Sequence, residues 1–183
     1  MNYGLLKSKL TGDEHHFYKT QPVDSNFMYS IFDTIDQGKD PICAACAATV
    51  FLKWNYNKDF NYYNLFENAG GTKEGISFIK MLKYLRSKGL IMEYALVHSE
   101  QALKTAITVN GPCLAGMSVR DSRRPDFWNG TKQEGMHGVA VIGWNDKGFI
   151  IKNSWGEDFG NNGTVILPHE RFSELQEIWT MIA

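Results

Sequence analysis

Three side chains from distant parts of the sequence have the types that a hydrolase with a cysteine nucleophile needs. Cys43 supplies a thiol, His137 an imidazole and Asn153 a side-chain amide. In such enzymes the thiolate attacks a carbonyl, the histidine carries the proton and a third group orients the histidine. If these three groups meet in space, they predict a peptidase or a close chemical relative.

The position of Cys43 favours a reactive thiol. Asp40 is a good helix N-cap and Pro41 is favoured at the first helical position, so a helix is predicted from these residues to about Tyr56. Cys43 would then lie in the first turn, where unpaired N–H groups and the positive end of the helix dipole lower the pKa of a thiol. The alternative is that Cys43 has no chemical role and packs as a small buried apolar side chain, as most free cysteines do.

The pairing of His137 with Asn153 is predicted from two short apolar segments. Gly135 and Gly138 flank His137, which indicates that the histidine lies at the mouth of a strand. Asn153 follows the next predicted strand, so its amide oxygen could fix one ring nitrogen and leave the other to face the thiol. Taken singly, such a histidine is more often structural, and such an asparagine is more often a turn residue.

The first half of the chain is predicted to be mainly helical. Residues 1–36 are irregular with scattered aromatic side chains, and they predict an arm that packs along the body of the protein. Residues 57–72, which follow the first helix, are polar, aromatic and turn-rich. Apolar spacing near 3.6 residues predicts further helices over 75–87 and 99–109, the latter capped by Ser99.

The sequence pattern changes after Asn110-Gly111-Pro112. The segments that follow are apolar and rich in β-branched residues, and they predict strands. These strands are predicted over residues 113–119, 139–144, 149–152, 164–167 and 178–182. Asp146-Lys147-Gly148 predicts a tight hairpin between the second and third of them. A helical first half and a mainly antiparallel second half predict an α+β domain with its helices segregated from a sheet or barrel.

Length and composition restrict the class of protein. The 183 residues suit one compact domain or two small lobes. A net charge of −1 favours neither a nucleic acid nor an anionic membrane surface as a partner, and no apolar run approaches the ~20 residues that span a bilayer. Residues 1–10 lack the apolar region of a secretory signal, and three cysteines do not form a disulfide framework, so a reducing compartment is expected.

Together these segments resemble the papain-like cysteine proteases from about Asp36 to the end of the chain. The resemblance rests on DQG and CAA within residues 36–45, on HGVAVIG at 137–143 and on KNSWG at 152–156. The match at KNSWG is highly specific. The resemblance as a whole implies a two-lobed papain-like fold, with the active site in the cleft between a helical left lobe and an antiparallel, β-barrel-like right lobe.

The resemblance also implies how the chain is divided. Residues 1–183 would form a single peptidase domain, made of an arm at 1–36, a helical lobe at 37–104 and a β lobe at 105–183. The implied reaction is hydrolysis of a peptide bond through a thioester acyl-enzyme. The implied partner is a peptide or protein substrate, acted on by a monomer, with no nucleic acid, no membrane, no metal and no organic cofactor.

The family pattern assigns roles to six residues. It implies Cys43 as nucleophile, His137 as general acid and base, and Asn153 as the residue that orients His137. Gln37 would form the oxyanion hole with the backbone N–H of Cys43. The pattern further implies two residues for the substrate side of the site, namely Trp155, which would shield the histidine–asparagine contact from water, and Gly75, whose backbone would pair with extended substrate.

The identity of the nucleophile depends on the register, because Cys43 and Cys46 form a C-x-x-C pair. A literal match to the family signature C-G-[SA]-C-[WY] would make Cys46 the nucleophile. In the family, however, the oxyanion glutamine lies six residues before the nucleophile, and six residues after Gln37 is Cys43. Cys46 would lie one turn deeper on the inward face of the helix, where a thiolate is costly to bury.

Several features depart from the family pattern. Ile42 and Ala44 flank the nucleophile, and Asp40 stands where secreted relatives carry a disulfide cysteine, which fits a compact, disulfide-free branch. His137 and Asn153 lie 94 and 110 residues after Cys43, whereas the signature expects about 130–150. The arm is too short for the usual helical prosegment, so zymogen control is expected to come from elsewhere. An intracellular or virion-associated location is expected, as in a bacterial cytosol, a virus or a phage.

Three other interpretations compete with a peptidase. The C-x-x-C pair could be redox-active, but that motif belongs near a βαβ pattern, which the arm lacks. A zinc site would need a second Cys or His pair at ligand spacing, whereas Cys113 stands alone and His15-His16 lie in a polar arm. A third alternative keeps the fold and changes the chemistry, giving a catalytically silent peptide-binding module or an acyl transferase.

Overall fold

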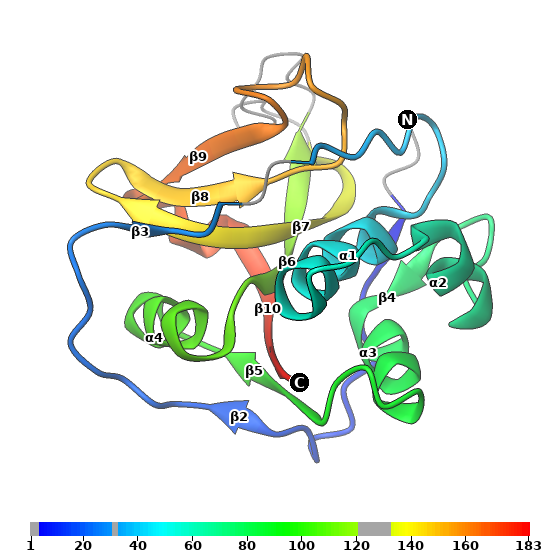
Figure 1. Ribbon diagram of the computed structural model, residues 1–183, viewed down its shortest axis with the longest axis horizontal. Helices are drawn as coiled ribbons and strands as arrows, with labels where there is room; N and C mark the ends of the chain where they lie inside the picture. The colour runs from blue at the N-terminus through cyan, green and yellow to red at the C-terminus, as the bar shows by residue number, and fades with distance from the viewer. Residues whose placement is uncertain (1–3, 31–32, 121–132) are drawn as a thin grey trace.

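The computed structural model describes residues 4–30, 33–120 and 133–183 (Figure 1). Residues 1–3 and 31–32 of the predicted arm therefore lie outside the described residues. The helices are α1 (Cys43–Tyr56), α2 (Tyr62–Asn68), α3 (Phe78–Ser87), α4 (Glu100–Asn110) and the 3-10 helix η1 (His169–Glu174). The strands are β1 (Leu5–Leu6), β2 (His16–Phe17), β3 (Phe27–Met28), β4 (Ile76–Ser77), β5 (Glu93–Val97), β6 (Cys113–Arg120), β7 (Gln133–Asn145), β8 (Gly148–Lys152), β9 (Thr164–Pro168) and β10 (Leu175–Ile182).

The main sheet has the strand order β2-β5-β10-β6-β7-β8-β9, and β3 pairs with β7 outside this path. Neighbouring strands are antiparallel except for β2 and β5. This arrangement confirms the predicted α+β class. The expected barrel-like closure is wrong, because β2 and β9 are the two edges of an open sheet in the part of the chain that the structure describes.

The first helix begins later than the sequence predicts. It starts at Cys43, with Ile42 as its N-cap and no side-chain cap. Asp40 does not start the helix, because its carbonyl accepts a hydrogen bond from Nε2 of Gln37 at 2.8 Å, whereas the carbonyl of an N-cap residue accepts the first bond of the helix. Its carboxylate instead accepts from the hydroxyl of Tyr63 at 2.8 Å.

Helix α2 and strand β5 lie where the sequence predicts no helix or strand. The turn-rich segment 57–72 contains α2, which Asn61 caps by accepting from the backbone N–H of Asn64 at 3.0 Å and which buries Leu65 and Phe66. The strand β5 pairs with β10 along an antiparallel register that includes Trp179 opposite Leu96. The sheet thus takes a strand from the segment assigned to the helical lobe.

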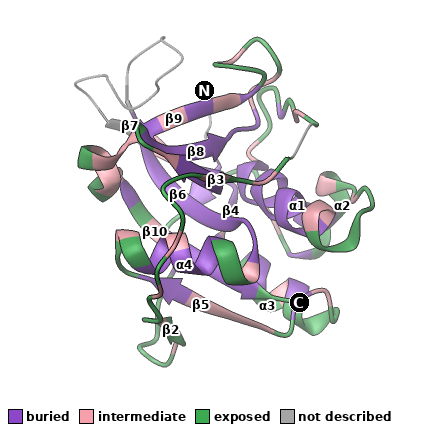
Figure 2. Ribbon diagram, turned by 60° about the vertical axis from the view of Figure 1, so that its left-hand side comes forward, coloured by how far each residue is buried: buried purple, intermediate pink, exposed green. Residues whose placement is uncertain are grey.

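Helix α1 is the buried centre of the fold. Its residues from Cys43 to Leu52 are all buried, and a helix that is apolar on all sides belongs inside a protein. Figure 2 shows α1 and the strands β6, β7 and β8 as mainly buried ribbon. The first residue of α1 therefore lies at the junction between the helices and the sheet.

The N-terminal arm contacts both parts of the molecule. Strand β1 pairs in parallel with β4, β2 pairs in parallel with β5, and β3 pairs antiparallel with β7. In Figure 1 the blue chain passes beside β4 and α3, continues to β2 and reaches β3 on the opposite side of the molecule. Within the described ranges, none of the helices has the length and apolar character needed to traverse a lipid bilayer.

Candidate active site

The sulfur of Cys43 lies directly against the strand that carries His137. The backbone N–H of Gly138 donates a hydrogen bond to Sγ of Cys43 at 3.3 Å. A glycine suits this close approach, because a Cβ at position 138 would make tight contacts, 3.3 Å from backbone atoms of Ala44 and 3.1 Å from the ring of Phe78. The sequence segment HGVAVIG therefore supplies both a histidine and the close contact beside it.

His137 and Asn153 are in contact in the interior of the protein. Nε2 of His137 lies 2.6 Å from Oδ1 of Asn153, and both side chains are buried. An amide oxygen only accepts, so Nε2 carries the proton and Nδ1 of the neutral ring carries the lone pair. Any exchange of a proton with a thiol must therefore use Nδ1.

The prediction that His137 lies at the mouth of a strand is wrong. Strand β7 begins at Gln133 and continues to Asn145, so the histidine lies inside it. The reason is the pairing with β6, which extends past the histidine and aligns Met117 with His137. The histidine is consequently held by backbone hydrogen bonding on either side rather than by a flexible loop.

Trp155 covers the imidazole. The ring centroids of Trp155 and His137 are 4.7 Å apart, and Phe159 packs edge-on against Trp155 at 4.9 Å. An isolated bridge pairs the backbone of Trp155 with Asp36, which precedes Gln37. The indole is therefore in a position to exclude water from the histidine–asparagine contact.

Gln37 is fixed by Ser154, a residue that sequence reasoning did not assign to the site. The backbone N–H of Gln37 donates to the carbonyl of Ser154 at 2.9 Å, and the hydroxyl of Ser154 donates to Oε1 of Gln37 at 2.6 Å. Ser154 is itself buried. The sequence signal that could have pointed to Ser154 is its place inside the specific segment KNSWG. Only the folded chain shows that this serine connects Asn153 and its neighbours to Gln37.

The environment of Cys43 has opposing effects on its thiol. The backbone N–H groups of Gly138, Ala44 and Cys43 itself lower the pKa, but complete burial outweighs them and raises the pKa of Cys43 to about 12. Burial also raises the pKa of Cys46, and the neighbouring Cys43 raises it further. None of the three cysteines, Cys43, Cys46 and Cys113, is in a disulfide.

Gly75 contacts the N-terminal arm. Its φ of +114° is in the region that favours glycine, and an added Cβ would lie 1.7 Å from the carbonyl oxygen of Gly4. Its backbone pairs locally with Thr72, while the N–H of the next residue, Ile76, donates to the Gly4 carbonyl at 2.9 Å. The edge at which an extended substrate was expected to pair is thus occupied by the protein's own chain.

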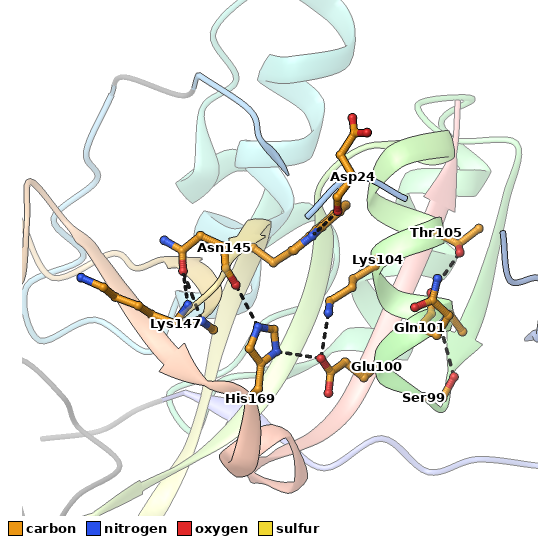
Figure 3. Close-up of polar contacts among 12 residues, drawn as sticks. Asp24, Ser99, Glu100, Gln101, Lys104, Thr105, Asn145, Lys147 and His169 are labelled. Carbon is orange, nitrogen blue, oxygen red and sulfur yellow. Dashed lines mark hydrogen bonds and ion pairs between the residues drawn. The ribbon is translucent and has the colours of Figure 1, made fainter. Parts of the chain in front are cut away.

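A second polar cluster surrounds His169 and includes none of the predicted site residues (Figure 3). Nδ1 of His169 lies 2.7 Å from the carboxylate of Glu100, and Nε2 lies 2.9 Å from the carbonyl of Asn145. Both partners, a carboxylate and a carbonyl, are hydrogen-bond acceptors. Lys104 completes the cluster at 2.9 Å from Glu100. In the described ranges, there is no group of three or more His, Cys, Asp or Glu side chains that could hold a metal ion.

Comparison with known families identifies the class of protein to which this fold and site belong. The model of the papain family cysteine proteases matches residues 80–177, which is more than half of the chain. The chain belongs to the papain family. The matched region includes His137 and Asn153 and begins after Cys43 and Gln37.

Individual relatives share a limited part of the sequence. Cathepsin B-like cysteine proteinase 1 of Ostertagia ostertagi is 35% identical over 79 residues, covering 38% of this chain and 23% of that protein. Cysteine proteinase 3 of Entamoeba histolytica is 34% identical over 87 residues, covering 39% of this chain and 27% of that protein. The matches span about a quarter of the length of these relatives.

Solved structures resemble the chain over nearly all of its length. Xylellain, a cysteine protease from Xylella fastidiosa, superimposes with a TM-score of 0.82 at 18% identity, covering 100% of this chain and 96% of that one. The proCathepsin B S9 structure from Trypanosoma congolense gives a TM-score of 0.79 at 14% identity, covering 99% and 86%. Digestive procathepsin L 3 of Tenebrio molitor gives 0.72 at 15%, covering 100% and 76%. These likenesses confirm the predicted papain-like fold.

Proposed function

We propose that the protein is a cysteine peptidase that hydrolyses peptide bonds with Cys43 as nucleophile and His137 as general acid and base. The observation that carries this proposal is the 2.6 Å contact between His137 and Asn153. It lies beside Gly138, whose N–H donates to the sulfur of Cys43 at 3.3 Å. Family membership supports the same chemistry. A peptide or protein is the substrate that such a site would take.

The proposed reaction begins with a proton transfer. Nδ1 of His137 accepts the proton of the Cys43 thiol, since Asn153 holds the other ring nitrogen as a donor. The thiolate attacks the substrate carbonyl carbon and forms a tetrahedral oxyanion. His137 then gives its proton to the leaving amine, and the thioester acyl-enzyme remains. A water molecule then gives a proton to His137 and its oxygen attacks the carbonyl carbon of the thioester. The C–S bond breaks, the carboxylic acid product leaves, and His137 returns the proton to the sulfur of Cys43.

The oxyanion is assigned to Gln37 and to the start of α1. Cys43 is the first residue of α1, where the positive end of the helix dipole favours a negative charge. Nε2 of Gln37 uses one hydrogen for the carbonyl of Asp40, and its second hydrogen remains for the oxyanion. The bond from the Ser154 hydroxyl to Oε1 supports this orientation of the amide.

The geometry favours Cys43 over Cys46 as nucleophile. The sulfur of Cys43 is the one that accepts from the residue after His137. Cys46 is buried in the apolar core of the helical part and interacts with Ser154. We therefore expect Cys43→Ala to abolish turnover and the matched change Cys46→Ala to retain most of it. The reverse result would contradict the assigned register.

Product analysis distinguishes the peptidase from an acyl transferase and from a catalytically silent peptide-binding module. The intact chain would be incubated with a mixed peptide library, with and without an added primary amine, and the products identified by mass spectrometry. Hydrolysed products that disappear in Cys43→Ala support the peptidase, whereas amine-capped products support an acyl transferase. A chain whose Cys43 reacts with a peptidyl electrophile but which releases no product would be a peptide-binding module.

A further inference from the structure

The first turn of α1 contains a second cysteine that the proposed hydrolysis does not use. Cys43 is the first residue of the helix, and Cys46 lies one turn on, where its N–H donates to the carbonyl of Ile42 at 3.0 Å. The Cα atoms of residues three positions apart in an α-helix are about 5 Å apart. A disulfide spans Cα separations of about 4.4–6.8 Å. The backbone therefore holds the two cysteines at a separation that a disulfide can bridge.

Both cysteines approach the same residue of β7, the strand that packs against α1 (Figure 1). The N–H of Gly138 donates to Sγ of Cys43 at 3.3 Å. Cys46 and Gly138 line one small cavity, which extends to Asn153 and Ser154. The two thiols also interact electrostatically, since Cys43 raises the pKa of Cys46. They are thus neighbours on one side of the helix.

A disulfide requires the first turn to tighten, and the start of α1 allows this. Side chains three positions apart on a helix have Cβ atoms about 5–6 Å apart, whereas a disulfide needs about 3.5–4.5 Å. Ile42, the N-cap residue, has φ −107° and ψ 13° and makes no side-chain cap bond that would resist a movement of Cys43. The cavity beside Cys46 leaves about 10 Å³ for the centre of a water-sized atom. This is about the space that one water molecule occupies, so a sulfur has room to turn.

The third cysteine belongs to a different part of the core. Cys43 and Cys46 lie in the core cluster of the helical part, whereas Cys113 lies in the core cluster of the sheet. The thiol of Cys113 contacts the carbonyl of Gly111 at 3.8 Å. Cys113 is equally free and equally buried, so it provides a matched control for the pair in α1.

We propose that Cys46 is a resolving cysteine, which forms a reversible disulfide with Cys43 when a hydroperoxide oxidises the nucleophile. This inference rests on the proposed peptidase function, because the thiolate that attacks a carbonyl is also the form that a peroxide oxidises. His137 takes the proton of Cys43, and the sulfur attacks one oxygen of hydrogen peroxide. The O–O bond breaks, and the hydroxide takes up the proton and leaves as water. Cys43 is then a sulfenic acid, its sulfur oxidised and the peroxide reduced.

The second step closes the disulfide. The sulfur of Cys46 attacks the sulfur of the sulfenic acid, an S–S bond forms, and the S–O bond breaks. The hydroxyl group leaves as water with the proton of the Cys46 thiol. Hydrolysis stops because Cys43 has no thiolate. A dithiol reductant restores both thiols and is itself oxidised to a disulfide. A bond within one helical turn is strained, and strained disulfides are readily reduced.

The proposal is tested on the full chain with hydrogen peroxide, followed by catalase and then dithiothreitol. Trypsin releases residues 40–53 as one peptide that contains both cysteines. In the parent chain this peptide should become lighter by two hydrogen atoms, and dithiothreitol should restore most of the peptide hydrolysis. In Cys46→Ala the peptide should gain two oxygen atoms as Cys43 passes to the irreversible sulfinic acid, leaving at least tenfold less activity after reduction. Cys113→Ala should behave as the parent chain.

The mass of this peptide requires neither activity nor a variant, so it separates this proposal from the proposed function. A reducible disulfide in a chain that hydrolyses no peptide would support the resolving cysteine and refute the peptidase. A peptidase in which Cys43 passes to the sulfinic acid without a disulfide would overturn the resolving cysteine alone. Recovery of Cys46→Ala as complete as that of the parent would also overturn it. If Cys46→Ala does not fold, the peptide mass in the parent chain decides.

Discussion

Replacing Asn153 by alanine would test the orienting hydrogen bond without touching the nucleophile. In the folded chain Nε2 of His137 donates to Oδ1 of Asn153 at 2.6 Å, and His137 has no exposed surface. The alanine leaves a buried N–H donor without this acceptor, at a cost of about 1–3 kcal/mol. Because the imidazole carries a charge during the reaction, the loss falls on the transition state, and about 1.4 kcal/mol corresponds to a tenfold change in rate.

The expected result is a fall in kcat of about 10–100-fold, with KM little changed because Asn153 is assigned no contact with the substrate. The assay is steady-state hydrolysis of a fluorogenic peptide selected from the library described above. Asn161→Ala, at an exposed asparagine of the following loop, is the control and should behave as the parent chain. His137→Ala should lose more, because orientation is partly recoverable and the proton carrier is not.

An Asn153→Ala variant with the full kcat of the parent would refute the assigned role of the amide. A loss confined to KM would also contradict the reasoning, because it would place Asn153 against the substrate rather than behind the histidine. Asn153→Asp adds a second test. Its carboxylate still accepts from Nε2 and stabilises the charged imidazole, so the pH dependence of kcat should shift to higher pH while the proton on Nε2 is retained.

Three more predictions concern the oxyanion site and stability. Gln37→Ala should lower kcat by about 10²–10³ if its amide stabilises the oxyanion, and an unchanged kcat would remove that role. Burial, and then the neighbouring His16, lower the pKa of His98 below its ordinary value of 6.5, so the folded chain binds fewer protons than the unfolded chain. The free energy of unfolding should therefore be highest above pH 6.5 and fall as the pH drops through the lowered pKa. Urea titrations from pH 8 to 5 should show this slope, and His98→Gln should flatten it. His169→Ala removes the contacts to Glu100 and to the Asn145 carbonyl and should lower the free energy of unfolding by about 1 kcal/mol with kcat unchanged, whereas a large loss of kcat would connect this distant cluster to catalysis.

Much of the fold follows from patterns that are local in the sequence. Ser99 accepts from the N–H of Ala102 and caps α4 as predicted. The hairpin predicted at Asp146-Lys147-Gly148 joins β7 to β8. Caps and tight turns depend on residues a few positions apart, so the sequence contains what is needed to predict them.

The sequence-based predictions are wrong where contacts between residues far apart in the chain decide which element forms or where it begins. Helix α1 starts at Cys43 because the side chain of Gln37 takes the carbonyl of Asp40. Strand β5 forms because β10, from the other end of the chain, pairs with it. The barrel-like expectation fails because closure requires the edge strands to pair, and the position of an edge is a property of the whole sheet.

The sequence by itself determined which residue types are available for the proposed reaction, and that Asn153 directly follows the strand next to that of His137. Only the tertiary structure decided that Ser154 fixes Gln37, that Gly138 admits the sulfur of Cys43, and that Gly4 lies against Gly75 and His137. These contacts join residues up to 133 positions apart. Periodicity and turn chemistry extend over a few residues, whereas such contacts exist only after apolar burial has brought the separate segments together.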